Sequence, residues 1–166
     1  SVVSPDGRSE LERIADIGQK MVLVASDLIV STYKNRVVSL ASDSGRLLWF
    51  KDISSATGLA VERTLLAVSE SNGDLWLLDR RNGSTLWKLD QLTNRGLTRP
   101  AFYGDLVVVG DKEGYLHWVD SESGRFVARQ KIQKKGFAAA PLTVGTTLYV
   151  LTQKGELVAY RAGAAL

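Results

Sequence analysis

The chain has 166 residues, of which 45% are hydrophobic, 23% charged and 8% aromatic, a balance typical of a folded globular domain and not of a disordered segment. It contains no cysteine and one histidine, which excludes disulfides, thiolate chemistry and a histidine-rich metal site. The formal net charge of +3 is too small to indicate nucleic-acid binding by itself, and no stretch reaches the roughly 18 apolar residues of a membrane-spanning helix.

Short predicted strands recur along the chain with one period, which is marked by turn residues. The turn glycines Gly45, Gly83 and Gly124 lie 38 and 41 residues apart. A second marker, ten residues earlier in each unit, repeats at 38, 41 and 41 residues; it consists of Asn35, Gly73, Gly114 and Gly155. Four short strands in each period of about 40 residues are the signature of a β-propeller blade.

In chain order, one strand precedes the first complete unit. Gly7 lies 38 residues before Gly45, so Glu10–Ala15 is predicted to be a fourth strand. The first strands of the following units are expected near Val22–Val24, Gly58–Val61, Arg99–Phe102 and Ala139–Thr143.

Second and third strands are predicted to form hairpins. The second strands are Leu28–Tyr33, Leu65–Glu70, Leu106–Asp111 and Leu148–Thr152, and the third strands are Arg36–Ala41, Asp74–Asp79, Tyr115–Asp120 and Glu156–Arg161. Asn or Gly in second place of the turn between them suits the positive φ of a tight hairpin. After a longer turn that ends in glycine, the fourth strands carry Trp49 and Trp87, while Ala128 takes this place in the third unit.

The sequence therefore predicts an all-β fold, a β-propeller of four-stranded antiparallel blades with about four blades in this chain. The predicted division is 1–20 for the last strand of a preceding blade, 21–55, 56–96 and 97–136 for three blades, and 137–166 for the first three strands of the last one. The N-terminal strand either closes a four-bladed ring, or the chain is a piece of a larger ring. An open piece would expose two apolar faces beyond what monomers carry, so further blades or self-association would have to cover them.

Several conspicuous side chains have a structural explanation. Trp49 and Trp87 recur at one repeat position and are predicted to pack between blades, not to bind a ligand. His117 lies in an apolar strand with no nucleophile pattern nearby, which favours a structural role over that of a general base. Asp79 and Asp120 recur one period apart and are expected to cap equivalent turns, not to form an acid–base pair.

A basic run lies in the last part of the third unit; it consists of Arg125, Arg129, Lys131, Lys134 and Lys135. The nearby acids Asp120 and Glu122, and the lack of interleaved aromatic residues, favour a solvated strand and loop over a nucleic-acid site. Attraction to an acidic partner surface or an anionic membrane is the alternative.

One stretch carries a specific family resemblance. Val109–Ile132, VGDKEGYLHWVDSESGRFVARQKI, closely resembles the penultimate blade of the BamB family of outer-membrane β-barrel assembly lipoproteins, a branch of the PQQ-type propeller repeats. Ser9–Ile17, residues 97–100 and Gly155–Arg161 match the same family in order and spacing. The resemblance implies an eight-bladed ring of about twice this length. This chain would be its C-terminal half, and the lipid-bearing cysteine would lie upstream.

The resemblance also implies a function. It points to a non-enzymatic scaffold of the outer-membrane barrel assembly complex, at the periplasmic face of the outer membrane and without a cofactor. The implied partners are the POTRA domains of the barrel insertase BamA, mainly the third, and unfolded outer-membrane protein clients. No nucleic-acid partner is implied, and membrane contact would be made only through the lipid anchor.

A family contact element falls near the N-terminus. The family has an acidic-x-acidic loop after the strand that matches Glu10–Ala15, and here the loop reads Asp16-Ile17-Gly18. Because only the first acid is kept, Asp16 is the predicted partner-binding residue, with a solvated loop acid as the alternative. Met21 replaces a family proline that Pro100 and Pro141 keep in later blades.

Two other function classes compete with the scaffold. A PQQ-dependent dehydrogenase domain would need a central cofactor site, a bound cation and a catalytic base, and the sequence offers neither an adjacent cysteine pair nor a convincing cation cluster. A generic interaction propeller would lack specific affinity for the insertase domains. We favour the scaffold.

Overall fold

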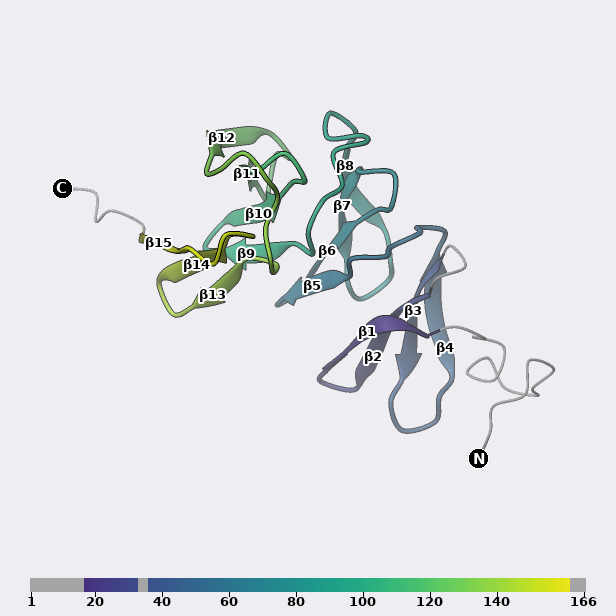
Figure 1. Cartoon of the computed structure of the whole chain (residues 1–166). Coiled ribbons are helices and arrows are strands. Elements are labelled where there is room, and N and C mark those ends of the chain that lie inside the picture. Colours follow the sequence, from purple (N-terminus) through teal and green to yellow (C-terminus); the bar gives the residue numbers. More distant parts are fainter. Residues whose placement is uncertain (1–16, 33–35, 162–166) are drawn as a thin grey trace.

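The computed structural model describes residues 17–32 and 36–161, and its regular structure there is entirely β. The strands are β1 Ile17–Val24, β2 Asp27–Thr32, β3 Arg36–Ala41, β4 Leu47–Lys51, β5 Leu59–Glu62, β6 Leu65–Ser69, β7 Leu75–Asp79, β8 Thr85–Leu89, β9 Ala101–Tyr103, β10 Leu106–Gly110, β11 Tyr115–Asp120, β12 Phe126–Lys131, β13 Leu142–Val144, β14 Thr147–Leu151 and β15 Leu157–Arg161. They form four antiparallel sheets, β1–β4, β5–β8, β9–β12 and β13–β15, each in chain order (Figure 1). The predicted all-β fold of propeller blades is confirmed.

The predicted hairpins agree closely with the structure. Second and third strands lie within one residue of their predicted bounds in all four sheets. The turn glycines have positive φ, including Gly73 at 100° and Gly114 at 84°. Glycine adopts this conformation without the steric cost that a Cβ atom imposes on other residues. The strand predicted at Glu10–Ala15 lies outside the described residues.

The first strands differ from the prediction. β9 and β13 begin later than expected, directly after Pro100 and Pro141, because proline has no N–H to donate to a strand ladder. β1 begins at Ile17, so Ile17 and Gly18 lie in a strand, and the prediction of a loop at Asp16-Ile17-Gly18 is wrong for these two residues. The blade boundary predicted at residue 20 also falls inside this strand. Met21, which stands where those later strands have proline, leaves an N–H available, and β1 continues on both sides of it with a register shift between Ile17 and Met21.

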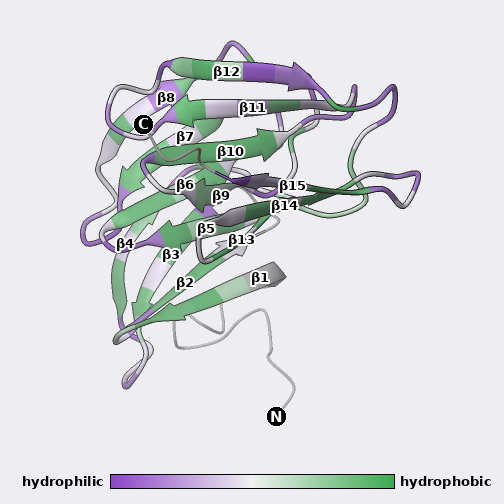
Figure 2. Ribbon diagram, turned by 90° about the vertical axis from the view of Figure 1, so that its left-hand side faces the viewer, coloured by the Kyte–Doolittle hydropathy of each residue, from purple (hydrophilic) through white to green (hydrophobic). Residues whose placement is uncertain are grey.

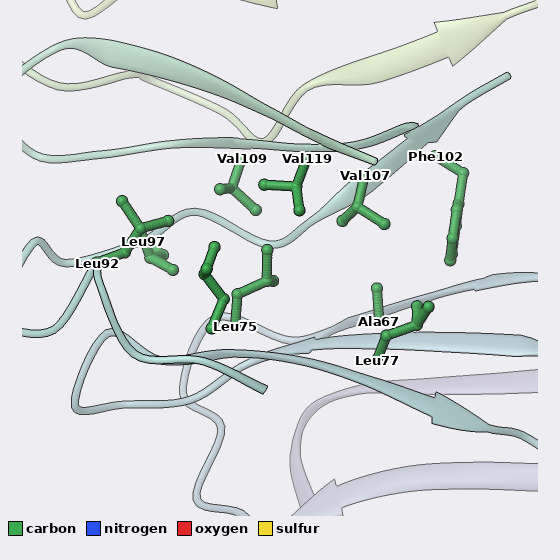
Figure 3. Packing of buried hydrophobic residues seen from close by; sticks show 10 residues of the cluster. Ala67, Leu75, Leu77, Leu92, Leu97, Phe102, Val107, Val109 and Val119 are labelled. Atoms are coloured by element: carbon green, nitrogen blue, oxygen red, sulfur yellow. The ribbon is translucent and has the colours of Figure 1, made fainter. Parts of the chain in front are cut away.

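The apolar core lies between neighbouring sheets. Figure 3 shows Leu75 and Leu77 of β7 facing Val107, Val109 and Val119 of the next sheet, and all five side chains are fully buried. Equivalent clusters join β1–β4 to β5–β8 and β9–β12 to β13–β15. The innermost strands β1, β5, β9 and β13 contact one another in turn, and the sheets follow an arc in Figure 1.

Each of the two tryptophans predicted to pack between blades contacts the next sheet. Trp49 in β4 donates its Nε1–H to the Arg80 carbonyl at 2.8 Å, and Trp87 in β8 donates to the Ser121 carbonyl at 2.9 Å. A Cβ atom on Gly83 would lie 2.6 Å from the Trp49 ring, and one on Gly124 would lie 2.8 Å from the Trp87 ring. The repeated glycine therefore both makes the turn and leaves room for the tryptophan of the preceding blade.

The two terminal sheets expose apolar side chains. In the last sheet Leu148 and Val150 pack on β9–β12, whereas Leu142, Val144 and Leu157 are 55%, 59% and 66% exposed. In the first sheet the exposed apolar side chains are Met21, Leu23, Leu48 and Phe50. In Figure 2 much of β1 and β2 of the first sheet is coloured as hydrophobic. The structure thus has the apolar end faces expected of an open arc of blades.

Candidate interaction face

The hairpin turns between second and third strands share one rim of the molecule with the connections between sheets. We call it the loop rim; it comprises residues 52–58, 70–74, 90–100, 111–115, 132–141 and 152–156. Backbone N–H to carbonyl hydrogen bonds join its segments. The donor and acceptor residues are Ser71 and Ser54 (2.7 Å), Asn94 and Asn72 (2.6 Å), Lys112 and Arg95 (3.0 Å), Ile132 and Gly114 (2.9 Å), and Gln153 and Gly136 (3.3 Å). The connections 90–100 and 132–141 therefore each tie together the turns of two neighbouring sheets.

A buried carboxylate organises the rim at the second sheet. Asp74 is 3% exposed and accepts hydrogen bonds from the Thr93 hydroxyl at 2.7 Å and the Asn72 amide at 3.0 Å. Lys88 Nζ lies 2.6 Å from its Oδ2. Burial alone would raise the pKa of Asp74, but the hydrogen bonds from Lys88, Thr93 and Asn72 outweigh it and lower the pKa. Asp74 is therefore a charged anchor that is satisfied within the chain.

A second buried carboxylate holds the rim at the third sheet. Asp111 is 1% exposed, and Arg95 Nε lies 2.6 Å from its Oδ2. The backbone N–H groups of Glu113 and Tyr115 donate to its Oδ1 at 2.9 and 3.0 Å. Burial acts to raise the pKa of Asp111, yet the hydrogen bonds from His117, Tyr115 and Arg95 lower it to about 2. This network fixes the 111–115 turn to the connection that carries Arg95.

His117 is part of the same network and has the structural role predicted for it. It is fully buried, and its Nε2 lies 2.8 Å from Asp111 Oδ2. Because that carboxylate is ionised and can only accept, Nε2 carries the hydrogen and donates the hydrogen bond. Nδ1 is buried and makes no hydrogen bond to a described residue. The rings of Tyr115 and Phe126 lie 6.3 and 5.9 Å away, centroid to centroid. His117 thus links two strands of one sheet.

The partnership of His117 with Asp111 was not predicted from the sequence. The signal that could have indicated it is a six-residue spacing across a tight hairpin. Glu70 and Trp76 have the same spacing in the preceding blade, where Trp76 Nε1 donates to Glu70 Oε2 at 2.7 Å. A polar residue directly after the second strand can therefore reach the side chain six residues later, in the third strand.

The acids Asp79 and Asp120 lie at the opposite rim and cap turns as predicted. Asp79 Oδ1 accepts the Arg81 backbone N–H at 2.9 Å, and Asp120 Oδ1 accepts the Ser123 backbone N–H at 2.7 Å. The hydrogen bond from the Arg81 side chain lowers the pKa of Asp79 to about 2, and the hydrogen bond from the Ser123 hydroxyl lowers the pKa of Asp120. The two acids belong to different sheets and form no pair.

Of the remaining predicted features, the basic run has two of its five residues, Arg129 and Lys131, on β12, whose residues are all exposed. No aromatic residue is interleaved in the run itself, but Tyr115 of the neighbouring strand contacts Arg129 and Lys131. Asp16, the predicted partner-binding residue, lies outside the described residues. Within the described ranges no three His, Cys, Asp or Glu side chains are placed to hold a metal ion, and no helix there is long and apolar enough to cross a bilayer.

The stability of the chain is expected to fall at low pH because of Asp111. Its pKa in the folded state, about 2, lies below the ordinary value of 3.8, so the ionised network stabilises fully above about pH 4 and is lost as the pH falls through about 2, by about 2 kcal/mol. Urea unfolding measured between about pH 6 and pH 2 checks this. The Asp111→Asn variant should lack this part of the pH dependence; an identical dependence in both proteins would show that other groups cause it.

The matching family model and two sequence relatives agree on one family. The family model described as outer membrane protein assembly factor BamB matches residues 1–89 and 86–165. Outer membrane protein assembly factor BamB of Pseudomonas aeruginosa is 42% identical over 96% of this chain and 42% of its own length. The protein of that name from Xanthomonas campestris is 37% identical over 95% of this chain and 39% of its own length.

A solved structure agrees in fold. The crystal structure of BamB from Moraxella catarrhalis superposes with a TM-score of 0.81 at 23% identity, covering 90% of this chain and 46% of that one. This chain therefore spans less than half the length of the relatives it matches. The four sheets correspond to propeller blades of that protein.

Proposed function

The chain belongs to the BamB family of outer membrane protein assembly factors, and from this premise we propose that it is part of a non-catalytic scaffold in the complex that assembles outer-membrane β-barrels. The observation that supports the proposal most directly is the family match along nearly the whole chain. The proposed location is the periplasmic face of the outer membrane, with a lipid anchor on the complete protein. The proposed partners are the POTRA domains of BamA, mainly the third, and unfolded outer-membrane proteins.

The loop rim is suited to a scaffold role. Its turns and connections are fixed to one another by backbone hydrogen bonds and by the buried carboxylates Asp74 and Asp111. Rigid scaffolds that present loops in fixed positions are a common basis of binding surfaces, and a rigid rim loses little conformational entropy when a partner binds. We propose that binding, and not chemistry, is the activity of this face.

The described side chains also favour binding over catalysis. Catalysis needs an activated nucleophile and a positioned base in one cleft. His117 is fully buried and its Nε2 is engaged by Asp111, and the acids Asp79 and Asp120 are occupied by turn N–H groups. These groups serve the fold, which is why we propose a scaffold and not a quinone-dependent dehydrogenase.

The decisive experiment measures binding of the full-length protein to purified POTRA domains of the matching insertase by biolayer interferometry. We expect the wild type to bind and Asp16→Arg to weaken binding roughly tenfold, mainly through a slower association rate, because a charge at an interface rim steers encounter. The matched control is Asp43→Arg, an equal charge change at an exposed turn acid, and it should bind like the wild type.

The outcomes separate the partner from the site. Binding that Asp16→Arg leaves unchanged would keep the POTRA partner and remove Asp16 from the interface. Absence of binding by the full-length wild type would overturn the proposed partner. Equal losses in Asp16→Arg and Asp43→Arg would indicate a general effect of net charge, which would also remove Asp16 as a specific contact.

A further inference from the structure

The ring of Tyr115 gathers three cationic side chains. The guanidinium carbons of Arg95 and Arg129 lie 5.3 and 4.1 Å from the ring centroid, and Lys131 Nζ lies 4.5 Å from it. We call these four residues the Tyr115 cation cluster. A cation over an aromatic face is attracted by the ring quadrupole, but three like charges around one ring also repel one another. The cluster is therefore a site of concentrated positive charge.

Only one of the three cations is neutralised within the described part of the chain. Arg95 lies 2.6 Å from Asp111 and 2.9 Å from Glu113. Arg129 and Lys131 lie on the exposed strand β12, and among the described side chains neither forms an ion pair. Figure 2 shows β12 passing from hydrophobic to hydrophilic along its length. These two cations are thus exposed and form no ion pair with any other side chain in the described ranges.

The neighbouring blade shows what is missing. One period before Arg129 lies Lys88, and one period before Tyr115 lies Asp74. In that blade the carboxylate of Asp74 neutralises Lys88 at 2.6 Å. In the third blade the aromatic ring has replaced the carboxylate while the cation has been kept. The carboxylate that the repeat supplies in one blade is absent from the other.

Further positive charge lies beside the cluster. A Cβ atom on Gly114 would meet the carbonyl oxygens of Gln133 and Lys135, and the Ile132 N–H donates to the Gly114 carbonyl at 2.9 Å. The loop that carries the exposed residues Lys134 and Lys135 therefore packs on the turn that precedes Tyr115. Lys134 and Lys135 thus add to the accessible positive charge of Arg129 and Lys131 at this part of the rim.

The base of the cluster is rigid. Asp111 fixes Arg95 through its Oδ2 and the Tyr115 backbone through its Oδ1, and it is itself held by His117 at 2.8 Å. A preorganised group loses less entropy on binding than a mobile one. The ring and Arg95 are therefore held in fixed positions, and Arg129 and Lys131 pack on the ring while their charges remain exposed to solvent.

We propose that the Tyr115 cation cluster docks an acidic segment of a partner protein, whose carboxylates take the place that Asp74 fills in the preceding blade. Arg129 offers a planar fork that matches a carboxylate, and Lys131 offers a point charge beside it. Discrete carboxylates suit the site better than a uniformly anionic membrane, because the exposed Glu113 lies beside the cluster, 2.9 Å from Arg95, and a flat anionic surface would meet this carboxylate too. This inference goes beyond the proposed function and does not depend on POTRA binding.

The test uses a fluorescein-labelled octaglutamate peptide and fluorescence anisotropy with the full-length protein. We expect binding that weakens with added salt and falls roughly tenfold or more in Arg129→Glu/Lys131→Glu. The control Arg46→Glu/Arg63→Glu makes the same charge change at two exposed residues in turns of the first and second sheets, at the opposite rim, and should stay within about twofold of the wild type. Tyr115→Asp, which restores the pattern of the preceding blade, should also weaken binding by supplying an internal carboxylate.

Three results would overturn the proposal. The first is no salt-sensitive binding of the peptide by the wild type. The second is an equal loss in the cluster and control variants, because that would reflect net charge alone. The third is binding to phosphatidylglycerol vesicles that the cluster variant abolishes while the peptide does not bind, because the ligand would then be a membrane surface. Thermal unfolding of each variant confirms that it is folded, and Tyr115→Asp provides the test if the double variant is not.

Discussion

Replacing Trp87 by alanine is expected to lower the free energy of unfolding by about 3 kcal/mol, the lower end of the range for large aromatic side chains. Trp87 packs against the apolar cluster between the second and third sheets and donates its Nε1–H to the Ser121 carbonyl at 2.9 Å. The substitution removes both contributions, and a rigid neighbouring turn cannot collapse into the space. Urea unfolding at neutral pH gives the difference.

The matched control is Leu86→Ala. Leu86 is adjacent in the same strand but 51% exposed, so its truncation should change the free energy of unfolding by less than about 0.5 kcal/mol. If Leu86→Ala and Trp87→Ala were equally destabilising, the effect would arise in the strand itself and not in docking between blades.

A double-mutant cycle tests the docking directly. Gly124→Ala alone should destabilise, because its Cβ would lie 2.8 Å from the Trp87 ring and its φ is +68°. In the Trp87→Ala background the steric part of that cost should disappear and only the cost of positive φ, about 1 kcal/mol, should remain. Strict additivity of the two substitutions would show that the ring and the glycine do not interact.

This docking pair was within reach of the sequence because its two halves recur with the period. Trp49 and Trp87 occupy one repeat position, and Gly83 and Gly124 occupy another, so the pattern indicates a contact made once per blade. The same periodicity located the second and third strands to within one residue. First strands were located less well because proline, and not hydrophobic alternation, determines where β9 and β13 begin.

The polar network of the loop rim was out of reach for a different reason. Arg95, Asp111 and His117 come from a connection, a strand end and a strand interior, and no local pattern joins the three. The Tyr115 cation cluster escaped for the same reason, since Arg129 and Lys131 meet the ring across a strand pair. Periodicity predicts what blades have in common, and these two features are where the third blade departs from the second.

Replacing Asp111 by alanine is expected to lower the free energy of unfolding by about 3–5 kcal/mol, the range for removing one partner of a buried ionic network. The carboxylate is the hydrogen-bond partner of the fully buried His117 at 2.8 Å, and it accepts the backbone N–H groups of Glu113 and Tyr115. Without it, these donors are left unsatisfied in a site that water does not reach. Arg95 retains Glu113 at 2.9 Å, which limits the loss.

Asp120→Ala is the control for this prediction, because Asp120 also accepts turn N–H groups but at the exposed opposite rim. Its loss should cost about 1 kcal/mol, as for other exposed side-chain caps. Urea unfolding of both variants distinguishes a buried network from ordinary turn capping, and equal effects would mean that the network adds nothing beyond its turn.

Asp111→Ala should also weaken octaglutamate binding, since Arg95 and Tyr115 would lose the group that positions them. A destabilised variant that binds the peptide like the wild type would separate the network from the cluster, leaving Asp111 with a role in folding alone.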